Sequence, residues 1–233
     1  MPAGASAKFR LVGNAGVEVT AGGRVVLVDA FYRPFAGVAG APALDPLALD
    51  RIDLILVTHL HGDHFDAPSL IAAARRTGAA VAGPGSVVGA LSSKVAPGRL
   101  LTLEPPGPGA SCSAAVDGIA VRAFRTVHTR DHNSYRVELG GFRFFHDGDN
   151  EDTVALNPES IRPLDALFIG TWQGSGWPGF IRKLKPARWV VIHLSDGEVE
   201  EHSSGKFLPG LCDSVPEGLL VLRPGETWEG SPS

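Results

Sequence analysis

The segment 58–64, Thr-His-Leu-His-Gly-Asp-His, brings three imidazoles and a carboxylate together within six residues, directly after an apolar run. Apolar runs of this length are typical of buried strands. Imidazole nitrogen and carboxylate oxygen suit zinc and related divalent cations. His59 and His61 leave the strand end on the same side, whereas the intervening glycine lets Asp63 and His64 turn toward a second position. The spacing therefore predicts two adjacent metal sites where a strand ends.

Three further ligand-type residues follow apolar segments later in the chain. They are His128 after residues 121–127, Asp149 after residues 142–148, and His193 after residues 188–192. Each segment has the composition of a buried strand, and ligands at strand ends are held on rigid supports. The competing interpretation of the first motif is a polar loop in which Asp63 merely caps a helix. Four ligand-type residues in six make that interpretation the weaker one.

The motif resembles the His-X-His-X-Asp-His signature of the metallo-β-lactamase superfamily, and the later residues follow the family's ligand order over nearly the whole chain. The resemblance implies an α/β fold, a four-layer αββα sandwich of two mixed sheets with helices outside. It also implies a dinuclear site: His59, His61 and His128 for one metal, Asp63, His64 and His193 for the other, and Asp149 as the bridge. The donor set favours Zn2+, with Mn2+ or Fe2+ as alternatives.

Two such cations about 3.5–4 Å apart would lower the pKa of a bridging water toward about 7 and polarise the bond under attack. The resemblance thus implies a metal-dependent hydrolase that uses a bridging hydroxide on an ester, lactone or phosphoester bond of a small substrate. One alternative is a phosphodiesterase acting on a nucleotide or lipid head group. Another is a non-catalytic metal-binding protein or sensor on the same fold.

Several residues are expected to assist the metals. Asp149 would orient the nucleophile, and Asp63 would accept a proton from it. His132, four residues after His128, either donates to the developing charge or is an exposed loop histidine. His146 resembles a histidine of the ascorbate-6-phosphate lactonase branch, the branch nearest in appearance, and is expected to support Asp149 from a buried position.

The residues that would select a substrate match the family less well. Asn150 stands where many members have Thr after the bridging Asp. Trp172 and Trp177 either form an aromatic wall for a substrate or fill the core. Lys183 and Lys185, near the end of the expected helix 179–184, either recognise phosphate or complement the helix dipole. The composition of 196–202 predicts a solvated acidic loop, so His202 is left out of the metal set.

The chain pattern predicts a single domain over residues 1–233, with 1–7 flexible. Expected strands are 9–12, 17–20, 24–28, 79–82, 100–104 and 219–222, the last at the edge of the second sheet; expected helices are 67–76, 86–93 and 179–184. Residues 105–109, Pro-Pro-Gly-Pro-Gly, are expected to form a surface turn rather than an interdomain linker. The first helix has Asp66 as its expected N-cap and stops at Gly78.

Composition fits an ordinary enzyme domain, with 44% hydrophobic residues among 233 and a formal charge of −4. The sequence has no basic patch of the kind that would predict a nucleic-acid partner. An anionic small-molecule substrate is still compatible with this net charge, because bound metal ions would reverse the local electric field. The first residues lack a leader pattern and no run of about 18 apolar residues occurs, so a cytoplasmic protein without a membrane partner is expected. Cys112 and Cys212 are expected to be buried thiols, with one disulfide as the alternative.

Overall fold

The computed structural model describes residues 6–33, 44–171 and 176–231. The first sheet contains β1 (Ala7–Gly13), β2 (Gly16–Ala21), β3 (Arg24–Val28), β4 (Leu54–Leu56), β5 (Ala80–Gly83), β6 (Leu100–Thr102) and β14 (Thr227–Gly230). The second contains β7 (Ser111–Val116), β8 (Ile119–Arg125), β9 (Asn133–Leu139), β10 (Phe142–His146), β11 (Ala166–Ile169), β12 (Arg188–Val191) and β13 (Leu219–Leu220). The α-helices are α1 (Ala67–Thr77), α2 (Gly85–Leu91), α3 (Trp177–Leu184) and α4 (Asp196–Ser203). Short 3-10 helices cover Pro97–Arg99, Thr153–Ala155, Pro158–Ser160 and Leu208–Gly210.

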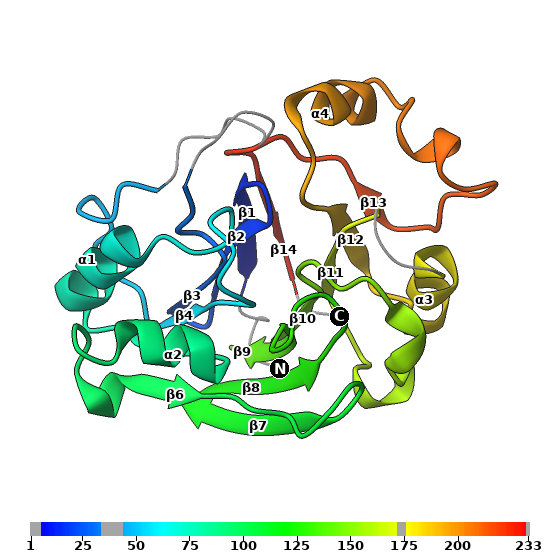
Figure 1. The fold of residues 1–233 in the computed structure, drawn as a ribbon. Coiled ribbons are helices and arrows are strands. Elements are labelled where there is room, and N and C mark those ends of the chain that lie inside the picture. The colour runs from blue at the N-terminus through cyan, green and yellow to red at the C-terminus, as the bar shows by residue number, and fades with distance from the viewer. Residues whose placement is uncertain (1–5, 34–43, 172–175, 232–233) are drawn as a thin grey trace, which may run out of the picture.

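The two sheets face one another, with α1 and α2 on one outer side and α3 on the other (Figure 1). Strand order is β14-β1-β2-β3-β4-β5-β6 in the first sheet and β13-β12-β11-β10-β9-β8-β7 in the second. The expected αββα sandwich is therefore confirmed.

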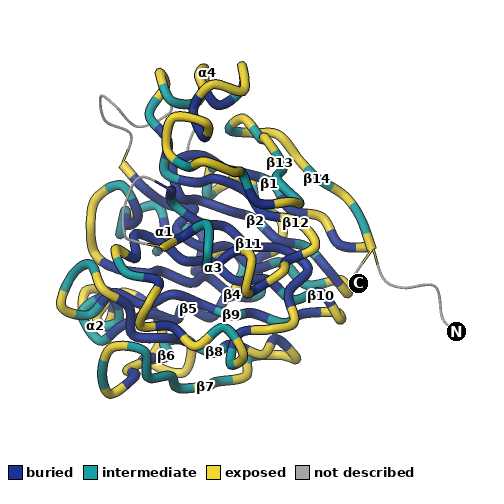
Figure 2. The backbone as a smooth tube through the Cα atoms, turned by 90° about the vertical axis from the view of Figure 1, so that its right-hand side faces the viewer, coloured by how far each residue is buried: buried dark blue, intermediate teal, exposed yellow. Residues whose placement is uncertain are grey.

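Three hydrophobic layers hold this arrangement together. The alternation of apolar residues along the strands fills the space between the sheets, where the rings of Phe9 and Phe168 meet edge to face with centroids 5.1 Å apart. Outside the first sheet, Leu70 of α1 packs in the same cluster as Val81 of β5, and outside the second sheet Phe180 of α3 belongs to the cluster there. Buried positions accordingly run through the middle of the molecule (Figure 2).

Helix α1 shows how closely local signals decide local structure. The Asp66 side chain accepts a hydrogen bond from the Ser69 N–H at 3.1 Å, and Gly78 ends the helix at φ 71° with its own N–H donated to the Ala74 carbonyl. Only a residue without Cβ takes this left-handed conformation at little cost. The expected start and stop of this helix are confirmed.

One prediction near the C-terminal end needs correction, and one strand there was not predicted. Residues 196–203 form helix α4, not a solvated loop, because the side chains of Ser195 and Glu198 make a capping box that begins the helix. The expected strand at 219–222 is present as β13 at the edge of the second sheet, but β14 follows it and pairs with β1 of the first sheet. The return of the chain to the first sheet was not predicted, because the pairing of β14 with β1 joins segments from opposite ends of the sequence.

The remaining expectations about chain organisation can be placed as follows. Residues 105–109 form the connection between β6 and β7, where the chain passes from the first sheet to the second. Cys112 and Cys212 are free thiols, each partly buried. The expected flexible stretch 1–7 falls mainly outside the described residues, and Ala7 already belongs to β1.

Strand direction positions the candidate ligands. In the first sheet β1, β3 and β4 run the same way, and in the second sheet β8, β10 and β12 do. Strands that run the same way bring their carboxyl ends to one edge of a sheet, where the loops that follow can converge. The candidate ligands all lie in these loops.

Candidate metal centre

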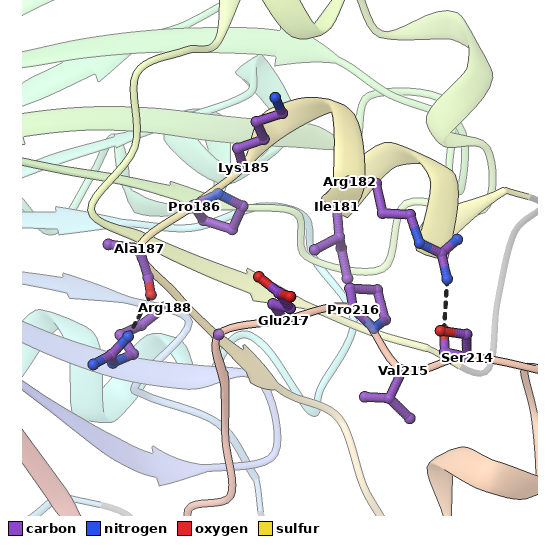
Figure 3. Close-up of a pocket in the computed structure, with 11 residues that line it drawn as sticks. Ile181, Arg182, Lys185, Pro186, Ala187, Arg188, Ser214, Val215, Pro216 and Glu217 are labelled. Atoms are coloured by element: carbon purple, nitrogen blue, oxygen red, sulfur yellow. Dashed lines mark hydrogen bonds between the residues drawn. The ribbon is translucent and has the colours of Figure 1, made fainter.

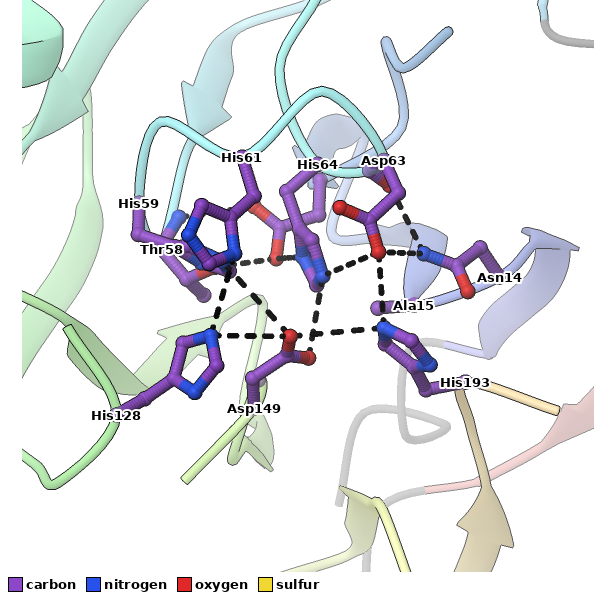
Figure 4. Close-up of polar contacts among 12 residues, drawn as sticks. Asn14, Ala15, Thr58, His59, His61, Asp63, His64, His128, Asp149 and His193 are labelled. Atoms are coloured by element: carbon purple, nitrogen blue, oxygen red, sulfur yellow. Dashed lines mark hydrogen bonds and ion pairs between the residues drawn. The ribbon is translucent and has the colours of Figure 1, made fainter. Parts of the chain in front are cut away.

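The seven candidate ligands from the sequence converge at one edge of the sandwich (Figure 4). Their ligand-type atoms form two groups, each with all atoms within 4.8 Å of one another. One group is His59, His61, His128 and Asp149, and the other is Asp63, His64, Asp149 and His193. The division into two sets with one shared carboxylate is the division that the family resemblance implied.

The Asp149 carboxylate stands between the two groups. Its Oδ2 lies 3.5 Å from His128 Nε2 and 3.5 Å from His193 Nε2, while its Oδ1 lies 3.1 Å from His64 Nε2. Within the first group, His61 Nδ1 and His128 Nε2 are 3.3 Å apart. The atoms are thus close enough for one carboxylate to serve both groups.

Carboxylates outside the cluster orient two of the imidazoles. His64 Nδ1 lies 2.8 Å from Asp29 Oδ2, and His128 Nδ1 lies 2.8 Å from Glu151 Oε1. A carboxylate accepts, so each Nδ1 carries the hydrogen and, in the neutral ring, Nε2 presents its lone pair to the cluster. Both rings are held in the tautomer that a metal requires.

Thr58 orients a third imidazole through the same aspartate. The Thr58 hydroxyl donates to Asp29 Oδ2 at 2.7 Å, so its oxygen accepts from His59 Nδ1–H at 2.9 Å, and the Thr58 main-chain N–H donates to Asp29 Oδ1 at 2.8 Å. Asp29 is fully buried and its backbone is left-handed at φ 48°. Asp29, which follows strand β3, therefore supports the imidazoles of both His64 and His59.

Unsatisfied buried atoms test whether these residues suit a metal. His59 Nε2, His64 Nε2 and Asp149 Oδ1 are shielded from solvent yet form no hydrogen bond of normal geometry. Buried polar atoms without partners are costly, and most that occur in proteins have a partner or a function. All three atoms face the interior of the cluster, where bound cations would satisfy them, so the residues present fit a metal site.

The charges of the cluster point the same way. Burial alone would raise the pKa of Asp149, but His64 and His193 outweigh it and hold that pKa well below its ordinary range. Burial alone would lower the pKa of His64, but the carboxylates of Asp149 and Asp29 raise it well above its ordinary value. Among the described residues, the ion-pair partners of Asp63 and Asp149 are histidines. The cluster is therefore arranged to hold positive charge between ionised carboxylates.

Asn14, which the sequence pattern did not single out, supports the second group. Its side-chain NH2 donates to the main-chain carbonyl of Asp63 at 2.9 Å, and its main-chain carbonyl accepts the His193 main-chain N–H at 2.9 Å. Both Asn14 and His193 have positive φ, 50° and 63°. Such conformations persist where the surroundings determine them, often at functional sites.

His132 is not an exposed loop histidine, because its side chain is fully buried. Its Nε2 accepts the main-chain N–H of Asp149 at 3.0 Å, and its Nδ1 lies 2.7 Å from Thr126 Oγ1. With both ring nitrogens engaged inside the protein, the geometry favours support of Asp149 over donation to a substrate.

His146 and Asp147, the other polar residues beside the bridging position, lie outside both ligand groups. His146 is buried, contacts the Ala15 carbonyl through Nε2 at 2.7 Å and accepts the Gly148 N–H at 3.2 Å, in agreement with a supporting role. The Asp147 carboxylate accepts from Ser134 and Asn150, and burial raises its pKa to about 7.

The proposed substrate contacts fare differently. Trp177 is buried in α3, with its ring 6.0 Å from that of Trp189, so it fills the core, and Trp172 lies outside the described residues. Lys185 lines a hollow of about 690 Å³ together with Arg182 and Arg188 (Figure 3). Because that hollow lies at the start of β12, whereas His193 follows its end, Lys185 does not reach the cluster. His202 is buried in α4 and belongs to neither ligand group.

The cluster is open on one side. His59, His64 and Asp149 are buried, whereas His61 is exposed and Asp63, His128 and His193 are partly exposed. A hollow of about 610 Å³ adjoins His128, with Val127, Arg130 and Pro105–Pro108 among its other walls. A small molecule can therefore approach the exposed ligands.

Comparison with known proteins bears on this fold and site. The beta-lactamase superfamily domain matches residues 24–199. A UPF0173 metal-dependent hydrolase of Nitratidesulfovibrio vulgaris is 33% identical, covering 92% of this chain and 92% of its own, and one of Thermococcus onnurineus is 28% identical, covering 95% and 99%. The solved structure of Igni18, a metallo hydrolase of Ignicoccus hospitalis, superposes with a TM-score of 0.70 at 18% identity, covering 97% of this chain and 99% of its own.

The protein has the metallo-β-lactamase fold: two mixed sheets lie between helices, with a His and Asp cluster at one edge. Together with its similarity to metal-dependent hydrolases, this identifies the protein as an enzyme of that class. The chain belongs to the beta-lactamase superfamily, among the UPF0173 metal-dependent hydrolases. The lactonase branch stays a prediction. Within the described ranges, no helix has the length and apolar character needed to cross a membrane.

Proposed function

We propose that this hydrolase is dinuclear and acts on an ester, lactone or phosphoester bond of a small substrate. His59, His61 and His128 would hold one cation and Asp63, His64 and His193 the other, with Asp149 shared. The observation that carries the proposal is the position of the Asp149 carboxylate, whose two oxygens contact imidazoles of both groups. The donor set favours Zn2+, with Mn2+ or Fe2+ as alternatives.

When bound, two such cations would lower the pKa of water at the site and polarise the oxygen of the scissile bond. The protein contributes orientation: Asp29 and Glu151 hold two imidazole rings through their outer nitrogens. The side chain of Asp63 is hydrogen bonded to His193 at 3.0 Å. Burial alone would raise the pKa of Asp63, but His193 and His64 hold it well below its ordinary range, which favours ligation over accepting a proton at neutral pH.

The open side of the cluster favours catalysis over a purely structural metal site. Structural zinc sites are closed by protein ligands, while catalytic sites keep a position for water or substrate. Here the side chains of Asp63, His128 and His193 remain 15%, 14% and 20% exposed, and a hollow that can receive a small molecule adjoins His128. This arrangement supports a hydrolase rather than a sensor.

Metal content per chain, measured on protein purified without chelator, tests the proposal together with hydrolysis of phosphodiester, lactone and thioester reporters. We expect two metals and turnover of at least one reporter. Asp149→Asn should bind at most one metal and lose most activity, while Asp117→Asn, in an exposed turn, should behave as the native protein. Fewer than one metal after reconstitution, or full activity in Asp149→Asn, would refute the assignment.

A further inference from the structure

A chain of hydrogen bonds connects the main chain of Asp149 with the side chain of Asp147. The Asp149 N–H donates to His132 Nε2 at 3.0 Å, and His132 Nδ1 lies 2.7 Å from Thr126 Oγ1. Thr126 Oγ1 lies 3.0 Å from Ser134 Oγ, which donates to the Asp147 carboxylate at 3.0 Å and to its carbonyl at 2.8 Å. All five residues are buried.

The direction of every hydrogen bond in this chain follows from its two ends. A main-chain N–H can only donate, so His132 Nε2 must be the acceptor and Nδ1 carries the ring hydrogen. Thr126 Oγ accepts that hydrogen and donates its own to Ser134, because the Ser134 hydroxyl hydrogen is directed to Asp147. If His132 were protonated, its Nε2–H would face the main-chain N–H of Asp149, and neither group could accept a hydrogen bond. Only the neutral ring therefore completes the chain.

Both ends of the chain are fixed to the turn 147–149, which carries the shared carboxylate. At the centre of the turn, Gly148 has φ +59°, and a Cβ there would lie 2.6 Å from His132 Nε2. The imidazole therefore packs directly against the turn. A change of ring position would alter the direction in which Asp149 leaves the backbone.

We propose that His132 is a positioning residue, which rests on the proposed function of the site: with Thr126 and Ser134 it holds the turn 147–149 so that the Asp149 carboxylate stands between both ligand groups. His132 acts through the Asp149 main chain and touches neither metal nor substrate. This role replaces the donation to substrate that its place in the sequence suggested.

Cobalt(II) binding tests the role through three variants of buried histidines. His132→Phe fills the space but removes the acceptor, whereas His132→Gln keeps an acceptor for the Asp149 N–H and a donor for Thr126. His202→Phe, in α4, is the matched control. We expect roughly 10–100-fold weaker binding of at least one cobalt and an altered absorption spectrum in His132→Phe, with recovery in His132→Gln and native behaviour in His202→Phe.

The outcomes separate this inference from the proposed function. Two cobalt ions in the native protein uphold the function, and native affinity and spectrum in His132→Phe would then overturn the inference alone. Equal losses in His132→Phe and His132→Gln would also overturn it, since a general packing defect would explain both. If His132→Phe does not fold, Thr126→Val should weaken cobalt binding and Thr126→Ser should restore it; native binding by Thr126→Val would refute the chain of hydrogen bonds.

Discussion

Asp29 provides the sharpest test of how the site is held, because its carboxylate accepts three hydrogen bonds in the protein interior. Their lengths are 2.8 Å from the Thr58 N–H, 2.7 Å from the Thr58 hydroxyl and 2.8 Å from His64 Nδ1. Asp29→Ala would leave three buried donors without an acceptor, at roughly 1–3 kcal/mol each. After allowance for the relieved burial of a charge, we expect a loss of about 3–5 kcal/mol in the free energy of unfolding.

Asp29→Asn separates metal binding from stability. The Thr58 main-chain N–H can only donate, so the new amide oxygen must take the place of Oδ1 and the amide NH2 the place of Oδ2. That NH2 then faces His64 Nδ1, which must become an acceptor and move its hydrogen to Nε2, the atom that faces Asp149. We therefore expect Asp29→Asn to weaken metal binding by about 10–100-fold while it destabilises the fold less than Asp29→Ala does.

Calorimetric unfolding of metal-free protein and zinc titration with a competing chelator measure the two effects. For a chain of this size, a loss of about 3–5 kcal/mol corresponds to a fall in melting temperature of roughly 10 °C. Asp117→Asn is the control, since the Asp117 side chain is 52% exposed and forms a surface ion pair with Arg99 at 3.6 Å. If Asp29→Asn binds zinc with native affinity, the tautomer argument is wrong.

Two further predictions concern the turn of the bridging residue and the pH dependence of metal binding. Gly148→Ala should weaken metal binding because the new Cβ would meet His132. Gly118→Ala is the control: Gly118 also has positive φ, but a Cβ there would have nothing within 4 Å, so this change should cost only about 1 kcal/mol of stability and leave metal binding intact. Metal titration and thermal unfolding measure both effects. Burial alone would lower the pKa of His193, but Asp149 and Asp63 raise it to about 9, and a metal needs the neutral ring. His64, whose pKa is also raised, must lose its proton as well. Zinc affinity should thus rise at least tenfold per pH unit below 9, with at least one proton released on binding; calorimetry in buffers of different ionisation enthalpy that finds no release would contradict this.

Local sequence signals were sufficient for much of the fold and for the composition of the cluster. Helix α1 begins at the Asp66 cap and ends at Gly78 as the pattern predicts, and the strands before His59 and His193 occur where apolar runs indicate them. A ligand that follows its strand directly needs no knowledge of distant contacts. Residues 195–198 carried a similar local signal, the Ser-X-X-Glu capping box of α4, which the acidic composition obscured.

Many of the supporting contacts could not be predicted because they join residues far apart in the chain. His146 contacts the carbonyl of Ala15, 131 positions away, and Asn14 contacts Asp63 across 49 positions. The buried position of His132 could not be predicted for a related reason. The loop after β8 folds back, with the Thr126 N–H donated to the His132 carbonyl, and the imidazole lies inside the protein rather than on an exposed loop.

The metal ligands and the residues that hydrogen-bond to them have different roles, and this difference bears on how variants of this enzyme should be interpreted. The ligand motif determines which atoms can bind a metal, but other residues determine which nitrogen carries the hydrogen in three of the five imidazoles. Asp29 does this for His64 and, through Thr58, for His59, while Glu151 does it for His128. A substitution that keeps every ligand can therefore still turn a lone pair into an N–H and remove the metal. A chain that retains the motif but lacks the acceptors at positions 29 and 151 should bind metal poorly for this reason.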